Sequence, residues 1–245
     1  MNTIKISNLS CCFNNRFVLR NVNLSVKRGS FVTIIGPFGS GKTTLLKIIA
    51  GLIDFHEGQV AINNQPPYVL RNNNKIGFSF QKPNLLPWRN VIANLTLPQE
   101  ITGSPYNPKR AFELLDMINQ RKLAKKKVNE LSGGMQQIVS ILRSLILDPD
   151  ILLLDEPFSS IDEISRDILH EQLLNIHNLS GKTTIMVTHS LQEAIYLSDK
   201  VIVLGGHPSS IVHIEHIRRS NTYDLHDKYS EDLLYYAKKL KEKLK

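Results

Sequence analysis

A phosphate-binding loop is the strongest chemical signal in the sequence. Residues 36–43 read Gly-Pro-Phe-Gly-Ser-Gly-Lys-Thr, between an apolar run at 31–35 and a helix-like stretch at 44–51. The glycines let backbone N–H groups turn toward phosphate oxygens, and the following helix offers the positive end of its dipole. We expect Lys42 to reach the β- and γ-phosphates and the Thr43 hydroxyl to bind Mg²⁺, because a hard cation prefers oxygen ligands. The spacing predicts a site for a nucleoside triphosphate with Mg²⁺.

A second motif supplies carboxylates. The apolar run at 151–154 ends in Asp155 and Glu156, which is typical of a buried strand that leads out of a sheet. In the same sheet as a phosphate loop, Asp155 would hold the Mg²⁺ shell and Glu156 would face the attacking water. A solvated loop start is the alternative for such a pair taken alone.

A double glycine marks the third motif. Residues 131–137 read Leu-Ser-Gly-Gly-Met-Gln-Gln and precede an amphipathic stretch that reaches residue 147. Ser132 can cap that helix, and Gly133 and Gly134 would leave N–H groups bare at its positive end. The glycine pair favours a second anion site, with a tight packing turn as the alternative.

The composition is that of an ordinary globular chain. Its 245 residues, 42% hydrophobic and 21% charged, are enough to bury a core. No run approaches the roughly 20 apolar residues of a membrane span, and the first residues lack a secretory pattern, so we expect neither membrane insertion nor export. Cys11 and Cys12 are adjacent, which disfavours a disulfide between them and suits a reducing compartment.

The net charge of +8 is concentrated in two basic clusters. One contains Arg121 and Lys122 with three lysines at 125–127, and the other fills residues 238–245. A solvated face is the first interpretation of each cluster, and a preference for an anionic membrane leaflet is the second.

The order of elements predicts an α/β nucleotide-binding core. Short β-type runs in residues 1–35 indicate a small antiparallel layer. Apolar runs at 151–154, 184–188 and 201–204 alternate with helical stretches, as in a parallel sheet with crossover helices. A helical lobe is predicted as an insertion at about residues 82–145.

With these motifs in place, the chain resembles the ATP-binding subunits of ABC transporters along nearly all of its length. Residues 131–137 resemble the family's signature motif, Gln81 its Q-loop glutamine, residues 159–162 its D-loop and His189 its switch histidine. Phe13 lies where the family keeps an aromatic residue that stacks on adenine. Any one of these is a weak signal, and together they occur in the family's order.

The resemblance implies a P-loop NTPase cassette of the α/β class. It would have a mainly parallel sheet core, an N-terminal antiparallel β layer and the inserted helical lobe. The ATP-binding domain would cover residues 1–220, followed by a basic C-terminal helix or tail at residues 221–245.

The resemblance also implies an ATPase that works as a head-to-tail dimer. ATP on one phosphate loop would be capped by the signature helix of a second subunit, and because the sequence holds one set of motifs, a homodimer is expected. Glu156 would polarise the water, His189 would contact the γ-phosphate, and Gln81 would sense Mg²⁺ and link the site to the helical lobe. The implied residues are Phe13, Gly36, Pro37, Phe38, Gly39, Ser40, Gly41, Lys42, Thr43 and Thr44 for ATP; Thr43, Gln81 and Asp155 for Mg²⁺; Ser132, Gly133, Gly134 and Gln136 for the partner's ATP; and Ser160 and Asp162 in the D-loop.

A few positions depart from the family's usual pattern. Phe38 replaces a small residue, and we expect tolerance because that position contributes backbone. Ile138 and Leu142 stand where an arginine and an alanine are common after the signature. A second Gly-Lys-Thr-Thr at residues 181–184 lies ahead of a strand instead of behind one, so we predict no second phosphate loop there.

The segment at residues 80–98 resembles the subgroup that serves nitrate, sulfonate, taurine and related importers. Its Leu-Leu-Pro-Trp run ends at Trp88, the only tryptophan of the chain, which is either an anchor for a permease helix or part of the lobe's own core. The subgroup implies transmembrane permease subunits, an extracellular or periplasmic substrate-binding protein, and a small anion or sulfonate-like nutrient. The chain itself would be cytoplasmic and peripheral on the inner face of the membrane.

Two other classes of protein are alternatives. A soluble ABC-type ATPase acting on nucleic acid or ribosomes would suit the basic charge, but such proteins usually add long coiled coils or a second cassette, and direct nucleic-acid binding is not expected. A nucleotide-gated module without turnover is disfavoured by Glu156 and His189.

Overall fold

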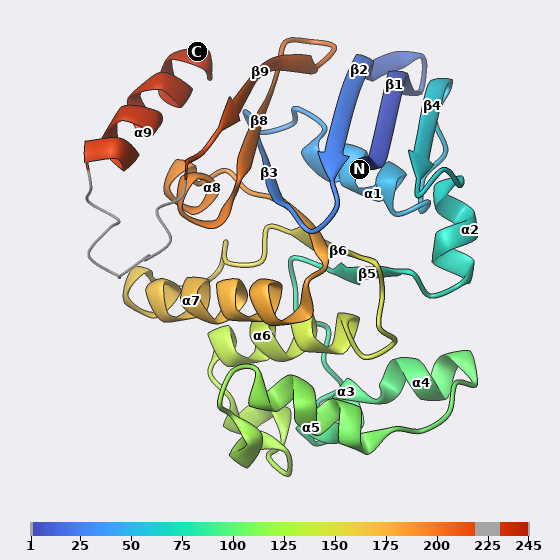
Figure 1. The fold of residues 1–245 in the computed structure, drawn as a ribbon, viewed down its shortest axis with the longest axis vertical. Helices are drawn as coiled ribbons and strands as arrows, with labels where there is room; N and C mark the ends of the chain where they lie inside the picture. Colours follow the sequence, from blue (N-terminus) through green and yellow to red (C-terminus); the bar gives the residue numbers. More distant parts are fainter. Residues whose placement is uncertain (1, 219–230, 245) are drawn as a thin grey trace. The chain divides into compact units, whose positions relative to one another are not determined.

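Two long antiparallel strands open the chain, β1 (Asn2–Phe13) and β2 (Arg16–Lys27). With β4 (Glu57–Ile62) they form a three-stranded sheet in the order β2-β1-β4, side by side in Figure 1. Both strands continue through asparagines with positive φ, Asn8 and Asn21, at shifts of the β1–β2 register. The sequence therefore shows several short β-type runs where the structure has two continuous strands.

The computed structural model describes residues 2–218 and 231–244, and the chain divides into two units. The first unit combines Met1–Asn73 with Thr183–Lys245, and the second is the contiguous stretch Asn74–Lys182. Of the predicted C-terminal helix or tail at 221–245, the first ten residues and the last lie outside the described residues. The remainder contains α9 (Glu231–Lys243).

The first unit also contains a mainly parallel sheet. Its strands are β3 (Phe31–Ile35), β7 (Thr183–Val187), β8 (Lys200–Gly205) and β9 (Ser210–His216). β7 and β8 flank β3 in parallel, and β9 runs antiparallel along β8. Every residue of β3 and β7 is buried, as expected for strands covered on both faces. The helices of this unit that lie near these strands in sequence are α1 (Lys42–Ile49), α2 (Pro67–Asn72) and α8 (Leu191–Leu197).

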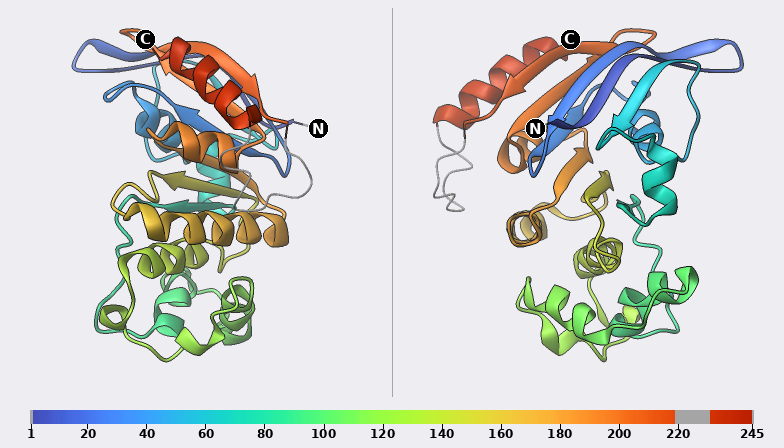
Figure 2. Two further views of the ribbon diagram at one scale, coloured as in Figure 1. Left: turned by 90° about the vertical axis from the view of Figure 1, so that its left-hand side faces the viewer. Right: turned by 45° about the vertical axis from the view of Figure 1, so that its right-hand side comes forward.

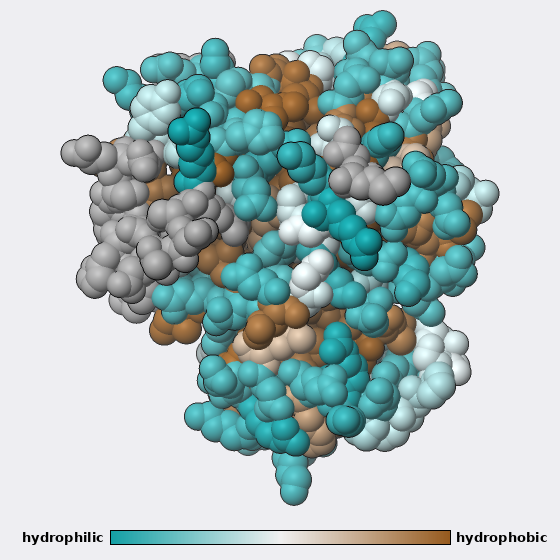
Figure 3. Space-filling view, viewed as in Figure 1, coloured by the Kyte–Doolittle hydropathy of each residue, from teal (hydrophilic) through white to brown (hydrophobic). Residues whose placement is uncertain are grey.

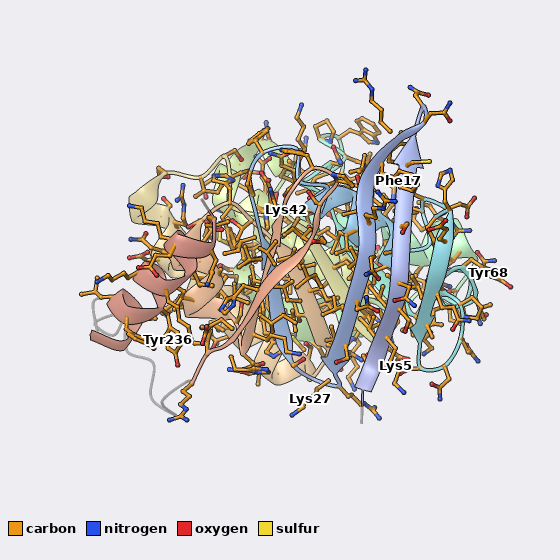
Figure 4. All side chains as sticks on the ribbon, turned by 90° about the horizontal axis from the view of Figure 1, so that it is seen from above. Lys5, Phe17, Lys27, Lys42, Tyr68 and Tyr236 are labelled. Carbon is orange, nitrogen blue, oxygen red and sulfur yellow. The ribbon has the colours of Figure 1, made fainter. Side chains whose placement is uncertain are left out.

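Helix α9 packs on α8 and β9, and Figure 2 shows it beside β9. Leu240 is fully buried in a cluster that includes Ala194 and Ile195. The carboxylate of Glu215 accepts hydrogen bonds from Lys239 at 2.7 Å and from His213 at 2.8 Å. Burial raises the pKa of Glu215, but the hydrogen bonds from Lys239 and His213 together with the charges of these two residues more than offset it, and the pKa lies below its usual value. Figure 4 shows Tyr236 on this helix, with Lys5 and Phe17 toward opposite ends of the β1–β2 pair.

The second unit pairs a short parallel sheet with most of the helices. β5 (Ile76–Ser79) and β6 (Ile151–Asp155) run in parallel. The helices are α3 (Val91–Leu95), α4 (Leu97–Thr102), α5 (Pro108–Asp116), α6 (Gly133–Ser144) and α7 (Glu163–Ser180), with 3₁₀ turns η1 (Arg121–Leu123) and η2 (Val128–Glu130). The antiparallel layer and the parallel core predicted from the sequence are confirmed.

Hydrophilic residues cover most of the face seen in Figure 3, with smaller hydrophobic patches between them. Within residues 2–218 and 231–244, no helix combines the length and the hydropathy that crossing a bilayer requires.

Candidate nucleotide site

The phosphate loop leads from β3 into α1, and the helix start is left open. The N-cap residue is Gly41, with φ of 80°, and no side chain caps the helix. A Cβ on this glycine would lie 2.8 Å from Cγ1 of Val18 on β2, so both the backbone angle and the close strand require glycine. No side chain therefore covers the start of α1, and the positive end of the helix dipole faces the loop.

The side chains of the loop fit phosphate oxygens. Lys42 is 6% exposed, and its Nζ donates to the carbonyl oxygens of Gly36 at 2.9 Å and Pro37 at 3.0 Å. The buried Ser40 hydroxyl has no hydrogen-bond partner among the described residues, so a ligand oxygen is the kind of partner it lacks. Phe38 is 91% exposed, so its ring is not part of the core.

The two other predicted ligand contacts of the first unit are exposed. Phe13 ends β1 and is 45% exposed, so its ring is not part of the core. His189 lies between β7 and α8 and is exposed. The turn that carries it is fixed on the α8 side, where Ser190 caps the helix and the Thr188 hydroxyl donates to the Glu193 carboxylate at 2.6 Å.

The carboxylates of the second unit follow from β6. Asp155 is the last residue of the strand and is 7% exposed, and Glu156 comes directly after it with φ of 44°. A glutamate in this backbone region costs on the order of 1 kcal/mol or more, and such strain is concentrated at functional sites. The Glu156 carbonyl accepts hydrogen bonds from the N–H of Ser159 at 3.3 Å and from its hydroxyl at 3.1 Å. The turn is thus held by Ser159.

Ser159 also connects the turn to the Q-loop. The side-chain amide of Gln81 donates to the Ser159 hydroxyl at 3.1 Å. This hydroxyl therefore joins Gln81 to the backbone of Glu156. The sequence analysis assigned Ser159 to the D-loop without a role of its own. Its position three residues after Glu156 could have indicated a turn in which its hydroxyl bonds the Glu156 carbonyl.

The two signature glycines do different things. At the start of α6, the Ser132 hydroxyl caps the helix by accepting the N–H of Met135 at 3.3 Å. A Cβ on the exposed Gly133 would meet nothing within 4 Å, whereas a Cβ on the buried Gly134 would lie 2.7 Å from Cδ1 of Leu169. The backbone at Gly133 is therefore open to a neighbouring group, whereas Gly134 is packed tightly against Leu169.

Other predicted residues around the signature have internal partners. The Gln136 amide donates to the carbonyls of Val128 and Leu131, both at 3.2 Å, and so holds the preceding turn. Ile138 and Leu142 are completely buried, so these departures from the family pattern fill the core of the second unit.

The D-loop residues lie at the start of α7. Ser160 is exposed, and Asp162 caps the helix by accepting the N–H of Ser165 at 2.9 Å. The hydrogen bonds from Ser165 lower the pKa of Asp162.

Trp88 is 73% exposed, so the alternative that it belongs to the lobe's core is wrong. A fully buried amide fixes its loop, since Asn94 accepts the Leu86 N–H at 2.7 Å and donates back to the Leu86 carbonyl at 3.1 Å. Arg143 donates to the carbonyls of Pro83 and Asn84 at 2.8 and 2.9 Å. The indole is therefore presented to solvent by an ordered loop.

A family model described as ABC transporter matches residues 19–159, more than half of the chain. The chain belongs to the ABC transporter family. It is an ATP-binding and ATP-hydrolysing cassette, and it is 39% identical over 213 residues to an aliphatic sulfonates import ATP-binding protein, SsuB, from Bacillus cereus, covering 85% of this chain and 84% of the relative. An uncharacterized ABC transporter ATP-binding protein from Methanocaldococcus jannaschii is 40% identical over 248 residues, covering 99% and 91%.

Solved cassettes have the same fold. A dimeric post-hydrolysis structure of the ATP-binding cassette MJ0796 bound to ADP and Pi has a TM-score of 0.74 and 33% identity, covering 89% of this chain and 100% of that one. The cassette cbiO1 from Clostridium perfringens, at 22% identity, supports the fold alone, with a TM-score of 0.81 and coverage of 98% and 95%.

The predicted Mg²⁺ ligands have suitable donor chemistry. A hydroxyl (Thr43), an amide (Gln81) and a carboxylate (Asp155) are hard oxygen donors, and Mg²⁺ takes few protein ligands beside waters and phosphate oxygens. In the part of the chain that the structure describes, no three His, Cys, Asp or Glu side chains gather as metal ligands.

Proposed function

We propose that this cassette hydrolyses ATP to power a membrane importer for a small anion, with sulfonate-like nutrients as the substrate class. The observation that carries the import assignment is the 39% identity to the aliphatic sulfonates import proteins over more than four fifths of both chains. The open helix start of α1, with Lys42 and Ser40 inside the loop, supports the ATP site.

In the proposed chemistry, residues 36–44 bind the phosphates and Phe13 stacks on the adenine. Glu156 accepts a proton from the water that attacks the γ-phosphate, ADP leaves, and His189 donates to the oxygens of the transferred group. Thr43, Gln81 and Asp155 would hold Mg²⁺, which neutralises charge on the phosphates.

Two copies are proposed to form the working enzyme. Each chain has one phosphate loop and one signature, so Ser132 and Gly133 of one subunit would face the γ-phosphate on the other. Gly134 would support this contact by allowing α6 to pack on Leu169. The exposed Ser160 and the helix cap Asp162 would lie at the contact between subunits.

The partners beyond this dimer are proposed to be permease subunits and an external substrate-binding protein. The cassette would lie in the cytoplasm on the inner face of the membrane, and Trp88 would be an anchor for the permease. Truncating a central aromatic residue of an interface often costs about 2 kcal/mol or more of binding energy, so Trp88 should contribute strongly to this contact. Nucleic acid is not proposed as a partner.

Reconstitution of the cassette with its permease and binding protein in proteoliposomes tests the proposal. We expect ATPase activity and uptake to rise with an alkanesulfonate or taurine, and Trp88→Ala to lower the stimulation by the permease. The matched control is Tyr106→Ala, which removes another exposed aromatic of the same unit, 64% exposed. Stimulation by none of sulfonates, taurine and nitrate would contradict the substrate class, and equal effects of the two variants would contradict the anchor.

A further inference from the structure

Four exposed lysines form a basic surface on the second unit. Lys122, Lys125, Lys126 and Lys127 are exposed, and none of them has an ion pair within residues 2–218 and 231–244. Buried apolar residues alternate with them, Leu123 and Ala124 at 6% exposure and Val128 at 7%. The apolar residues fix the backbone of this segment, so the charges are kept on its outer side.

Trp88 belongs to the same surface. The N–H of Val91 donates to the Lys126 carbonyl at 2.9 Å, and the N–H of Ile92 donates to the Ala124 carbonyl at 3.1 Å. Asn90 forms an antiparallel bridge with Lys127, and Trp88 comes only two residues earlier. Two residues span at most about 7 Å, so the exposed indole and the lysines lie close together.

The residue types favour an extended anionic surface over an acidic protein segment. Lysine is a flexible, strongly hydrated point charge, whereas arginine provides the fork that binds carboxylates with fixed geometry. The only arginine of the cluster, Arg121, is already engaged, with Asp116 at 2.6 Å and over the ring of Phe112 at 4.8 Å. A hydrated cation cluster beside an exposed tryptophan is the combination that suits a lipid headgroup layer.

We propose that the basic surface, Lys122, Lys125, Lys126 and Lys127, binds anionic lipid headgroups next to the place where Trp88 meets the permease. The proposal rests on the membrane-bound position of the cassette given under its proposed function. In the second basic cluster of the sequence, Lys239 on α9 is paired with Glu215 within the fold.

Vesicle flotation with the full chain tests the proposal. The protein should bind phosphatidylcholine vesicles that contain phosphatidylglycerol, with salt weakening the binding, and should not bind phosphatidylcholine alone. The emission of Trp88, the only tryptophan, should shift to shorter wavelength on binding. The triple variant Lys125→Gln, Lys126→Gln, Lys127→Gln should bind on the order of 100-fold more weakly, at roughly fivefold for each lysine.

A matched control removes the same charge elsewhere. The triple variant Lys238→Gln, Lys241→Gln, Lys243→Gln neutralises three exposed lysines of α9 and should retain vesicle binding. ATPase activity in solution should be unchanged in both variants, which shows that both are folded.

Several results would overturn the proposal. Equal losses in the two triple variants would mean that only net charge matters, and unchanged Trp88 emission on bound vesicles would place the contact elsewhere. Normal vesicle binding by the first variant, combined with lost stimulation by the permease in detergent, would make an acidic permease segment the occupant. The vesicle assay contains neither permease nor nutrient, so its failure would leave the transport function standing, and failure of transport would leave the vesicle result standing.

Discussion

Two helices follow glycine-containing motifs, α1 in the first unit and α6 in the second, and they differ in how their first turn is capped. α1 begins after Gly41 with no side-chain cap, whereas α6 is capped by the hydroxyl of Ser132. A side-chain cap stabilises a helix start without any ligand, and an uncapped start lacks that contribution. The start of α6 therefore has a stabilising side chain that the start of α1 lacks, and substitutions in the two regions should have different effects.

Loss of the general base should have the largest effect on ATP turnover. It should also show that turnover depends on the second unit while ATP binding depends on the first. Glu156→Gln in the second unit should lower ATP turnover by about 10²- to 10⁴-fold, because it removes the proton acceptor while keeping the shape of the side chain. ATP binding at the phosphate loop should persist. A phosphate-release assay measures turnover, and calorimetry measures ATP binding. Glu171→Gln, another glutamate of the same unit, is the control. Turnover near the wild-type rate in Glu156→Gln would contradict its role as the general base.

The opposite result is expected for the first unit. Lys42→Ala should weaken ATP binding by about 10- to 100-fold, since hydrogen bonds to charged groups contribute about 1.5–3 kcal/mol each. Lys47→Ala, in the last turn of the same helix, is the control for a lost lysine. Calorimetry that finds equal affinities for the two variants would contradict the role of Lys42.

The signature glycines allow a sharper test within one motif. Gly134→Ala should destabilise the fold by about 1–3 kcal/mol, because its Cβ must displace the side chain of Leu169. Gly133→Ala should leave the free energy of unfolding near that of the wild type but hinder the dimer that ATP drives in a Glu156→Gln background. Urea unfolding and light scattering measure the two effects, and a reversed pattern would exchange the roles of the glycines.

The smallest effect concerns the cap itself. Ser132→Ala should cost about 1 kcal/mol of stability without nucleotide, because the Met135 N–H loses its acceptor. The uncapped α1 offers no comparable side chain to remove. A thermal unfolding midpoint unchanged by Ser132→Ala would mean that the two helix starts do not differ in stability as proposed.

Local motifs made the loop, the carboxylate pair and the signature predictable from the sequence. The sequence also predicts that the Gly-Lys-Thr-Thr at 181–184 is not a second phosphate loop. In the structure this segment follows α7 and leads into β7, so it precedes a strand as predicted. The tolerance of Phe38 in the loop stays a prediction, and its side chain is exposed.

Contacts between distant residues were not predictable. Gly134 is needed because of Leu169 on another helix, and Ser159 matters because Gln81 reaches it. Such partners are set by packing of elements far apart in sequence, which periodicity does not record.

The insertion of the second unit between β3 and β7 has a consequence for biosynthesis. Both neighbours of β3 in its sheet come from residues 183 onward, whereas the second unit is one uninterrupted stretch. At about 5–20 residues per second, roughly 7–30 s separate the synthesis of β3 from that of β7. During this time the five residues of β3, all buried in the finished fold, have neither of their two neighbouring strands to pair with. The second unit is therefore synthesised in full before β3 gains either of its neighbours, so the sheet around β3 cannot form until residues 183–205 have been made.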